Sequence, residues 1–486
     1  MELKSVLSGI EGLKAKGDLD IDITAISRDS KEVREGALFI AVKGFETDGH
    51  KFIKEALANG AAAVMVEQSA SIKKTDVQED TVIIAAPDTR MAISKAASNF
   101  YGNPSARLKV VGVTGTKGKT TTTFMIKAIL EKHGLKTGLI GTIANYIGDE
   151  KIGDSERTTP DSIELQELLA KMAEEKVDVV IMEVSSQSLK LHRADDVDFD
   201  IGLFTNFSED HISIKEHPDM EDYFNSKVKL FNMCKMGYIN ADDFNVMKIK
   251  KMETKSEIKT YGIDNSSDLT AKDITVTNTA VDFKVKIGAR NERIKVGIPG
   301  RFSVYNSLAA ICVGLKYGAT ADEIKEALLN IKVPGRSELV PNKKGLTIII
   351  DYAHSPESLQ SVLKAIKSYT KGRVISLFGC GGDRDKIKRP KMGEISGNIA
   401  DFTIITSDNP RTEKPEEIIN EIEEGIKKTK GKYITIINRT EAIKYAINMA
   451  HKDDVIILAG KGHEAYQEVN GVKNHYDERE IVRKLI

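Results

Sequence analysis

The segment 110–124, VVGVTGTKGKTTTTF, holds residues suited to binding nucleotide phosphates. An apolar run leads into a glycine-rich turn, and a helical pattern follows the turn. Gly115 and Gly118 let backbone N–H groups approach phosphate oxygens, because neither residue carries a Cβ atom. Lys119 can reach the β- and γ-phosphates, and the hydroxyl of Thr120 can bind Mg²⁺. We interpret the segment as a P-loop of the short form TGTxGKTT.

A P-loop does not name a reaction, because kinases, motors, switches and ligases all use one. Glu183 ends the apolar run 177–184, and a carboxylate at that point can bind Mg²⁺ or simply face solvent. His211 follows the next apolar run, 200–207, and a lone histidine is more often structural than a ligand. Lys227 lies in an amphipathic stretch, where a surface position is the ordinary interpretation.

The elements that must position these residues form an α/β fold with three domains, which we place at 1–103, 104–333 and 334–486. The smaller N-terminal α/β domain has short β-like runs at 37–42, 62–67 and 81–86. The central P-loop domain has continuous apolar runs, which are typical of a mostly parallel, buried sheet.

Two further segments complete this prediction. Residues 250–297 alternate polar and apolar side chains, which indicates antiparallel strands. Thr320 and Glu323 have the spacing of a capping box at a helix start. Beyond Pro334, strand-like and helix-like stretches alternate strictly until the run DVIILAG, which we expect to close the series. This alternation predicts a doubly wound, Rossmann-like parallel sheet with ligands at the carboxyl ends of its strands.

Composition excludes several classes of protein. There are 71 Lys and Arg residues against 72 Asp and Glu residues, so the net charge of −1 argues against a nucleic-acid-coating chain. No apolar run reaches the ~18 residues of a membrane span, and the first residues are too charged for a signal peptide. The three distant cysteines form neither a disulfide framework nor a zinc motif. We expect a cytoplasmic protein that binds no nucleic acid and does not insert into a membrane.

Ten short motifs follow one another in an order that resembles the Mur ligases of peptidoglycan synthesis. They are GTKGKTT, TTP, MEVSSQSL, NFSEDH, YFNSKVKLF, PGRSE, DYAHSPESL, FGCGGDRDKIKRPKM, SDNPR and GKGHE. GTxGKTT is shared by the whole family, whereas GCGGDRD, DNPR and GKGHE together resemble the ligases that add the third peptide residue. The motifs span nearly the whole chain.

The resemblance implies an ATP-dependent amide ligase that works through an acyl phosphate. ATP is the co-substrate and Mg²⁺ the cofactor, and the protein is expected to be a monomer. The implied catalytic residues are Lys119, Glu183, His211 and Lys227. The implied metal ligands are Thr120, Glu183, His211 and Lys227, with Lys227 carried as a carbamate (N6-carboxylysine), since an ammonium cannot coordinate Mg²⁺.

The resemblance also implies three sets of binding residues. ATP would be bound by Gly115, Thr116, Lys117, Gly118, Lys119, Thr120, Thr121, Asn306, Arg336, Asp351 and His354. UDP-MurNAc-L-Ala-D-Glu would be bound by Ser30, Thr158, Thr159, Ser185 and Arg193. The incoming amino acid would be bound by Arg384, Asp408, Asn409, Pro410, Arg411, Gly460 and Glu464. Outside the family context, each isolated hydroxyl would be interpreted as a cap or a solvated loop residue.

The DNPR form of the second-last motif favours meso-diaminopimelate as the amino acid joined to D-Glu. The planar guanidinium of Arg411 suits the distal carboxylate of diaminopimelate, and lysine would leave this cation unpaired. The alternatives are the same ligase using L-lysine, and a folylpolyglutamate synthetase or another Mur ligase. A folylpolyglutamate synthetase or another Mur ligase would leave the DNPR and GKGHE motifs without a function. A P-loop switch or motor that forms no amide is the remaining class.

Overall fold

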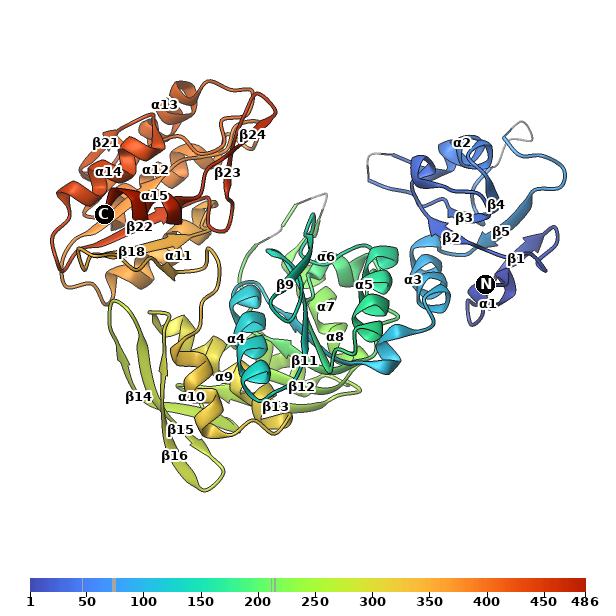
Figure 1. The fold of residues 1–486 in the computed structure, drawn as a ribbon, viewed down its shortest axis with the longest axis horizontal. Coiled ribbons are helices and arrows are strands. Elements are labelled where there is room, and N and C mark those ends of the chain that lie inside the picture. The colour runs from blue at the N-terminus through green and yellow to red at the C-terminus, as the bar shows by residue number, and fades with distance from the viewer. Residues whose placement is uncertain (46, 72–75, 211, 214–215) are drawn as a thin grey trace. The chain divides into compact units, whose positions relative to one another are not determined.

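The computed structural model describes residues 1–486 apart from 46, 72–75, 211 and 214–215 (Figure 1). The chain forms two compact units. One consists of Met1–Asp268 with Ala309–Ala319, and the other consists of Leu269–Leu308 with Thr320–Ile486. Strands and helices alternate in both units, so the predicted α/β class is confirmed.

The first unit begins with a five-stranded sheet in the order β1-β5-β4-β3-β2. Its strands are parallel except for β1, which runs antiparallel to β5. Alternate residues of β3 and β4 pack on opposite faces because side chains of a strand point alternately to its two sides. The elements are α1 (Leu3–Val6), β1 (Lys14–Lys16), β2 (Ala25–Ser27), β3 (Ala37–Ile40), α2 (Ile53–Ala58), β4 (Ala61–Glu67), β5 (Val82–Ala86) and α3 (Thr89–Phe100).

A larger sheet of the same unit has the order β13-β12-β11-β6-β10-β7-β8-β9. The first six of these strands are parallel, and β8 and β9 are added antiparallel. The expectation of antiparallel strands over 250–297 is wrong for β13, which pairs in parallel with β12.

The elements of this part are β6 (Lys109–Thr114), α4 (Lys119–Lys132), β7 (Thr137–Ile140), β8 (Ala144–Ile147), β9 (Glu150–Asp154), α5 (Ser162–Glu174), β10 (Val179–Glu183), α6 (Ser186–Lys190), β11 (Phe199–Phe204), α7 (Met220–Val228), α8 (Leu230–Met233), β12 (Cys234–Asn240) and β13 (Glu257–Gly262). Strand β6 lies between β10 and β11. The loops that follow these three parallel strands therefore emerge side by side at one edge of the sheet.

The second unit begins with the antiparallel strands β14, β15 and β16, as predicted. Helix α10 starts at the predicted capping box, in which Thr320 Oγ1 accepts from the Glu323 N–H and the Glu323 carboxylate accepts from the Thr320 N–H. The elements are β14 (Leu269–Val276), β15 (Val281–Ile287), β16 (Arg290–Val296), α9 (Arg301–Lys316, its second half belonging to the first unit) and α10 (Ala321–Leu329).

The rest of the second unit is a six-stranded sheet in the order β17-β18-β22-β19-β20-β21. Its strands are parallel except for β17. Helices α11, α12 and α13 pack on one face, and α14 and α15 pack on the other, so the predicted doubly wound arrangement is confirmed (Figure 1).

The elements of this sheet and its helices are β17 (Glu338–Leu339), β18 (Thr347–Asp351), α11 (Pro356–Lys367), β19 (Val374–Phe378), α12 (Lys388–Ile399), β20 (Phe402–Ile405), α13 (Pro415–Ile426), β21 (Tyr433–Thr435), α14 (Arg439–Met449), β22 (Val455–Ala459), β23 (Tyr466–Val469), β24 (Val472–His475) and α15 (Glu478–Leu485). As predicted, β22 is the last strand of the parallel series. The β23–β24 hairpin and α15, which follow β22, were not predicted.

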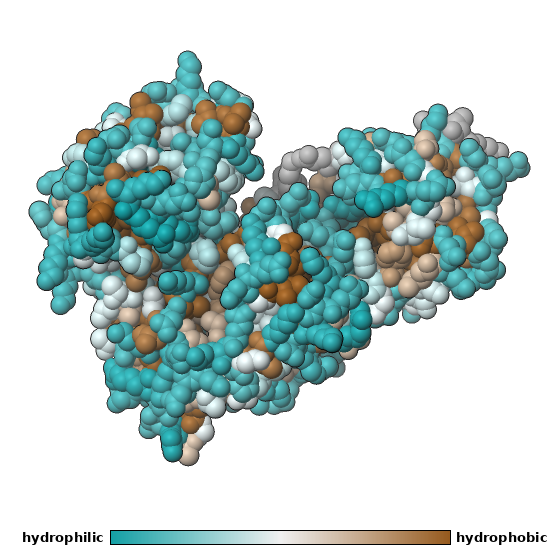
Figure 2. Space-filling model, viewed as in Figure 1, coloured by the Kyte–Doolittle hydropathy of each residue, from teal (hydrophilic) through white to brown (hydrophobic). Residues whose placement is uncertain are grey.

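Strands and helices both contribute to the buried cores. Figure 2 shows a face that is mostly hydrophilic, with apolar residues in scattered patches. Among the described residues, none of the helices combines the length and the apolar character needed to cross a membrane.

Candidate active site

The predicted P-loop joins β6 to α4, and the residues after β11 hold it in shape. Gly115 and Gly118 have φ angles of 137° and 85°, which a glycine adopts without strain. A Cβ atom on Gly115 would lie only 2.0 Å from Thr205 Oγ1. The Asn206 amide accepts a hydrogen bond from the Lys117 N–H and donates one to the Lys117 carbonyl, both at 2.9 Å. The sequence did not indicate this bracing role of Thr205 and Asn206.

Lys119 is the first residue of α4 and folds back over the loop. Its Nζ donates to the carbonyl oxygens of Gly115 at 2.9 Å and Thr116 at 3.1 Å. Thr120 and Thr121 follow it and are buried in the first turn of the helix. A glycine-rich turn at a helix N-terminus is an arrangement that binds phosphate, and Lys119 adds a positive charge to it.

Glu183 ends β10 beside the P-loop and is 1% exposed. Its Oε2 accepts from Thr120 Oγ1 at 3.0 Å and from Thr142 Oγ1 at 3.1 Å. Its Oε1 accepts from the Thr142 N–H at 2.9 Å. This buried set of carboxylate and hydroxyl oxygens fits Mg²⁺, which prefers oxygen ligands. No sequence motif indicated Thr142, although it follows strand β7 at the same sheet edge.

The other two predicted metal ligands are His211 and Lys227. His211 lies outside the described residues. Within the described part of the chain, no group of three or more His, Cys, Asp or Glu side chains is arranged to hold a metal ion. Among the described residues, the oxygens available for a site here are those of Thr120 and Glu183, together with any that modification or the substrates supply.

Lys227 is buried, not at the surface. It lies in α7 and is 1% exposed. Its Nζ donates to the Gly115 carbonyl at 3.0 Å and lies 4.5 Å from the centre of the Tyr223 ring. Burial, followed by the charge of Lys119, lowers the pKa of Lys227 well below its usual value. The surface position that the amphipathic pattern predicted for Lys227 is therefore wrong. Its amine is held next to the P-loop.

Three predicted dipeptide-binding residues gather around the end of β10. Thr159 Oγ1 donates to the Glu183 carbonyl at 2.9 Å and accepts from the Ser185 N–H at 3.0 Å. The hydroxyls of Thr158 and Thr142 are 3.1 Å apart. The hydroxyl groups of the TTP and SSQ motifs therefore lie within one hydrogen-bonded network beside Glu183.

Arg193 belongs to a cluster of arginines around Asp161. Its Nε lies 3.0 Å from Asp161 Oδ1, and Arg157 Nη1 lies 2.9 Å from Asp161 Oδ2. Arg28 also pairs with Asp161 Oδ2. Three cations thus share one carboxylate, which leaves a positive excess suited to an anionic ligand. Neither Arg28 nor Arg157 stood out in the sequence, because exposed arginines are common.

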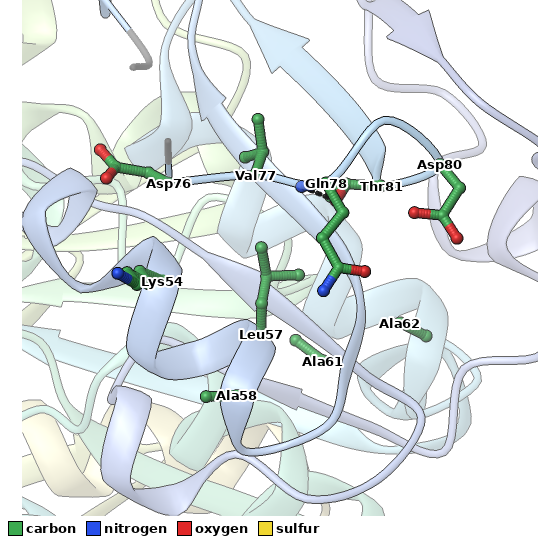
Figure 3. A pocket seen from close by; sticks show the side chains of 10 residues that line it. All are labelled: Lys54, Leu57, Ala58, Ala61, Ala62, Asp76, Val77, Gln78, Asp80 and Thr81. Carbon is green, nitrogen blue, oxygen red and sulfur yellow. Dashed lines mark hydrogen bonds between the residues drawn. The ribbon is translucent and has the colours of Figure 1, made fainter. Parts of the chain in front are cut away.

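Ser30 has a different environment from the other predicted dipeptide ligands. Its Oγ donates to Glu55 Oε2 at 2.7 Å, and its carbonyl accepts from Asn59 Nδ2 at 2.9 Å. A surface cavity of about 410 Å³ is lined partly by α2, the helix that contains Glu55 (Figure 3). Its lining includes none of the predicted site residues and consists of Lys54, Leu57, Ala58, Ala61, Ala62, Asp76, Val77, Gln78, Asp80 and Thr81.

The second unit places three predicted nucleotide ligands at the end of β18. Asp351 accepts from the N–H groups of Ser337 at 2.7 Å and Ala353 at 2.9 Å, while burial raises its pKa. The Arg336 guanidinium stacks on the Tyr352 ring at 4.8 Å. His354 Nδ1 lies 2.8 Å from the Tyr352 carbonyl oxygen. Asn306 is buried in α9.

The predicted amino-acid ligands follow three neighbouring strands, β22, β19 and β20, which explains why distant motifs meet. Asn409 Nδ2 donates to Glu464 Oε2 at 2.8 Å, and Asn409 Oδ1 accepts from Lys461 Nζ at 2.9 Å. Gly460 has a φ of 113°, and a Cβ atom there would lie 2.7 Å from Asp408 Oδ2. Burial raises the pKa of Glu464 and lowers the pKa of Lys461.

Arg411 already has a carboxylate partner. Its Nε donates to Glu468 Oε2 at 3.0 Å, and its Nη1 donates to the Gly382 carbonyl at 2.9 Å. The expectation that lysine would leave this cation unpaired is therefore wrong, because Glu468 of the β23–β24 hairpin pairs with it. Pro410 is buried before it, and Arg384 is exposed. The sequence offered no signal for Glu468.

Three family models match successive parts of the chain. The model described as "Mur ligase family, catalytic domain" matches residues 22–101, "Mur ligase middle domain" matches 113–314, and "Mur ligase, glutamate ligase domain" matches 335–462. Together they cover most of the sequence.

The chain is also similar to individual proteins along its full length. It is 47% identical to a UDP-N-acetylmuramoyl-L-alanyl-D-glutamate–2,6-diaminopimelate ligase of Caldanaerobacter subterraneus, over 100% of this chain and 99% of the relative. It is 44% identical to the ligase of the same name from Clostridium perfringens, with the same coverage. A solved structure of a protein with this name is 29% identical, with a TM-score of 0.71, and the match covers 100% of this chain and 98% of that one.

Proposed function

The chain belongs to the Mur ligase family, and we propose that it joins meso-diaminopimelate to the D-Glu of UDP-MurNAc-L-Ala-D-Glu in peptidoglycan precursor synthesis. The observation that carries this function is the 47% identity, over the full length, to a 2,6-diaminopimelate ligase. The enzyme is an ATP-dependent acid–amino-acid ligase. ATP and the UDP-linked substrate are intracellular metabolites, so we place the reaction in the cytoplasm. That the enzyme acts as a monomer stays a prediction.

Two steps make up the proposed reaction. A D-Glu carboxylate oxygen forms a bond to the γ-phosphorus of ATP, and the bond between this phosphorus and ADP breaks. The amine of diaminopimelate then attacks the acyl carbon, loses a proton and expels phosphate, which leaves an amide. The first step brings two anions together, so it depends on positioning and on positive charge. Lys119 and the N-terminus of α4 supply that charge in this chain.

Mg²⁺ is the proposed cofactor, and it would neutralise phosphate charge when bound. The Thr120 hydroxyl and the Glu183 carboxylate would hold one ion, since these oxygens already lie 3.0 Å apart. Glu183, His211 and a carbamate on Lys227 would hold a second. A carbamate forms from a neutral amine and CO₂, and the burial of Lys227 favours its neutral amine.

The binding residues are proposed in the same way. Thr158, Thr159, Ser185, Arg193 and Ser30 would bind UDP-MurNAc-dipeptide, and the arginines around Asp161 support an anionic ligand there. Asn306, Arg336, Asp351 and His354 would bind ATP with the P-loop residues. The amino acid would be bound by Arg384, Asp408, Asn409, Pro410, Arg411, Gly460 and Glu464. The domain boundaries at 103/104 and 333/334 also stay a proposal.

Incubation with UDP-MurNAc-L-Ala-D-Glu, ATP and Mg²⁺ tests this function. Diaminopimelate and L-lysine are supplied in separate reactions, and the product is identified by mass. We expect the diaminopimelate product together with ADP, and no product when ATP is omitted. Efficient formation of only the lysine product would replace the proposed substrate, and ATP hydrolysis without any amide would contradict the ligase.

A further inference from the structure

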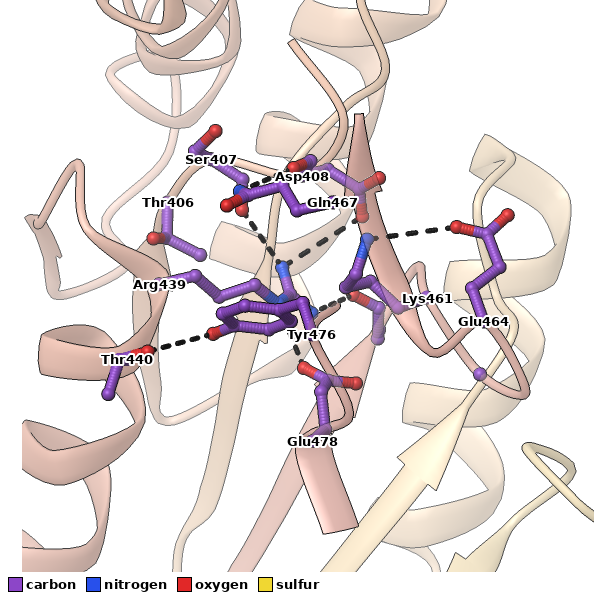
Figure 4. Close-up of polar contacts among 12 residues, drawn as sticks. Thr406, Ser407, Asp408, Arg439, Thr440, Lys461, Glu464, Gln467, Tyr476 and Glu478 are labelled. Carbon is purple, nitrogen blue, oxygen red and sulfur yellow. Dashed lines mark hydrogen bonds and ion pairs between the residues drawn. The ribbon is translucent and has the colours of Figure 1, made fainter. Parts of the chain in front are cut away.

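A buried ionic cluster adjoins the proposed amino-acid site (Figure 4). Its central residue is Arg439, whose side chain is 0% exposed. Arg439 begins α14, and its Nε donates to Glu478 Oε1 at 2.8 Å. Glu478 begins α15 and is itself 1% exposed. None of the motifs that identify the family includes either residue.

The guanidinium of Arg439 also holds the starts of two site loops. Its Nη2 donates to the Ala459 carbonyl at 2.9 Å, and its Nη1 donates to the Ser407 carbonyl at 3.3 Å. Ala459 directly precedes Gly460, and Ser407 directly precedes Asp408. One planar group therefore fixes the backbone at the beginning of both the GKGHE and the DNPR loops, which suits the several fixed donors of arginine.

Asp408 lies close to Arg439 without a hydrogen bond to it. The distance from Asp408 Oδ2 to Arg439 Nη1 is 3.9 Å, whereas Asp408 Oδ1 accepts from the Asn409 N–H at 2.8 Å. Asp408 is 8% exposed, and its Oδ2 has no hydrogen-bond partner within the described part of the chain. A buried carboxylate oxygen without a partner is unfavourable unless a ligand supplies the donor.

The charges of the cluster are consistent with a cationic ligand. Arg439 and Lys461 are its cations, and Asp408, Glu464 and Glu478 are its carboxylates (Figure 4). If all five are ionised, one negative charge remains. An ammonium group of the incoming amino acid would balance this charge.

We infer that Arg439 and Glu478 are positioning residues for the amino-acid site, in which Glu478 holds Arg439 away from Asp408. Asp408 Oδ2 then stays available for the ammonium of the incoming amino acid, and Arg439 keeps both loops in place. This inference rests on the proposed function. Without the Glu478 charge, Arg439 would be drawn onto Asp408 and would compete with the substrate.

The test compares two substitutions at Glu478 in the full-length enzyme. Glu478→Gln keeps the size and one oxygen acceptor but removes the charge, and we expect it to raise the KM for diaminopimelate about tenfold. Glu478→Asp keeps the charge in a shorter side chain, and we expect a KM within about threefold of wild type by the same reasoning. If Glu478 only filled space, Glu478→Asp would raise the KM more than Glu478→Gln, because Gln fills the space better than Asp.

Asp454→Asn is the matched control. Asp454 is 4% exposed and pairs with Arg373, with Arg373 Nη2 2.6 Å from its Oδ2, at the opposite end of the same strands. This control should lower the melting temperature without changing the KM for diaminopimelate. The KM values for ATP and the UDP-linked substrate should stay unchanged in all three variants.

The outcomes separate this inference from the proposed function. Wild-type product formation is measured first, and its absence would contradict the proposed function. Two results, each with normal wild-type turnover, would overturn this inference but not the proposed function. One is an unchanged KM for diaminopimelate in Glu478→Gln, and the other is an equal rise of this KM in Asp454→Asn. If Glu478→Gln does not fold, Arg439→Lys replaces it. One ammonium cannot hold both carbonyls, so KM should again rise about tenfold, and an unchanged KM would overturn the inference.

Discussion

We propose that phosphate transfer depends most directly on the side chain of Lys119. It lies at the start of α4 with its Nζ against the P-loop carbonyls. We expect Lys119→Ala to lower kcat by about 10²–10³-fold or more, because one charged donor to the transferred phosphate is lost. The measurement is turnover at saturating ATP, with circular dichroism to show that the variant is folded. If Lys119→Ala turned over as fast as wild type, the assignment of this segment as a P-loop would be contradicted.

The second prediction concerns the chemical state of Lys227, because a buried lysine can act either as a cation or as a carbamate. We expect Lys227→Ala to be inactive and to regain some activity when a short carboxylic acid such as acetate is added. The acid would supply the oxygen ligand that the proposed carbamate would otherwise provide. Lys227→Arg is the matched control, since it keeps the cation but cannot form a carbamate, and it should stay inactive. An active Lys227→Arg would contradict the carbamate.

Single residues also show what the sequence could and could not predict. The P-loop glycines and Glu183 were found because a strand, a turn and a helix follow one another locally. The burial of Lys227 was not found, since its neighbours in space come from distant segments. The pairing of Arg411 with Glu468 was missed for the same reason. Contacts between residues far apart in the sequence leave no periodic signal.

Whole strands and helices were predicted well where their apolar pattern is strong. Continuous apolar runs became β6, β10, β11 and β22, because both faces of these strands are buried. The predicted direction of β13 was wrong, since polar and apolar side chains alternate in any half-covered strand, whether parallel or antiparallel. The β23–β24 hairpin was missed because most of its side chains are exposed or half-buried.

The packing of α12 against the start of α13 gives a prediction for acid stability. Arg389 of α12 is fully buried and donates to both carboxylate oxygens of Glu413, at 2.9 and 2.8 Å. These hydrogen bonds lower the pKa of Glu413 from its usual 4.5 to about 2. A lowered carboxyl pKa stabilises the fold above pH 4.5, and this contribution is lost as the pH falls from 4.5 toward 2.

We therefore expect Glu413→Gln to destabilise the protein at pH 7 by about 1–3 kcal/mol. The difference from wild type should shrink as the pH falls below 4.5, since the wild-type carboxylate then becomes protonated. Urea unfolding at several pH values measures this. Glu417→Gln is the control, because Glu417 is exposed and lies 3.9 Å from Lys414. A Glu413→Gln effect that does not change with pH would contradict the role of this charge.

For the molecule as a whole, the order of strands decides which motifs meet. The sequence predicted that ligands bind at the carboxyl ends of parallel strands, and the loops carrying GCGGD, DNPR and GKGHE do follow the neighbouring strands β19, β20 and β22. The sequence could not predict this order, because β22 enters the sheet between β18 and β19 although it comes last of the parallel strands in the chain. Such an insertion depends on packing across both faces of the sheet.

At the scale of the whole enzyme, we propose a preference for meso-diaminopimelate over L-lysine. The measurement is kcat/KM for meso-diaminopimelate and for L-lysine, with wild type and with Arg411→Ala. We predict that wild type prefers diaminopimelate by at least about tenfold, and that Arg411→Ala loses most of this preference because the distal carboxylate loses its guanidinium partner. A wild-type enzyme that uses lysine better, or an Arg411→Ala variant that keeps the full preference, would contradict this assignment.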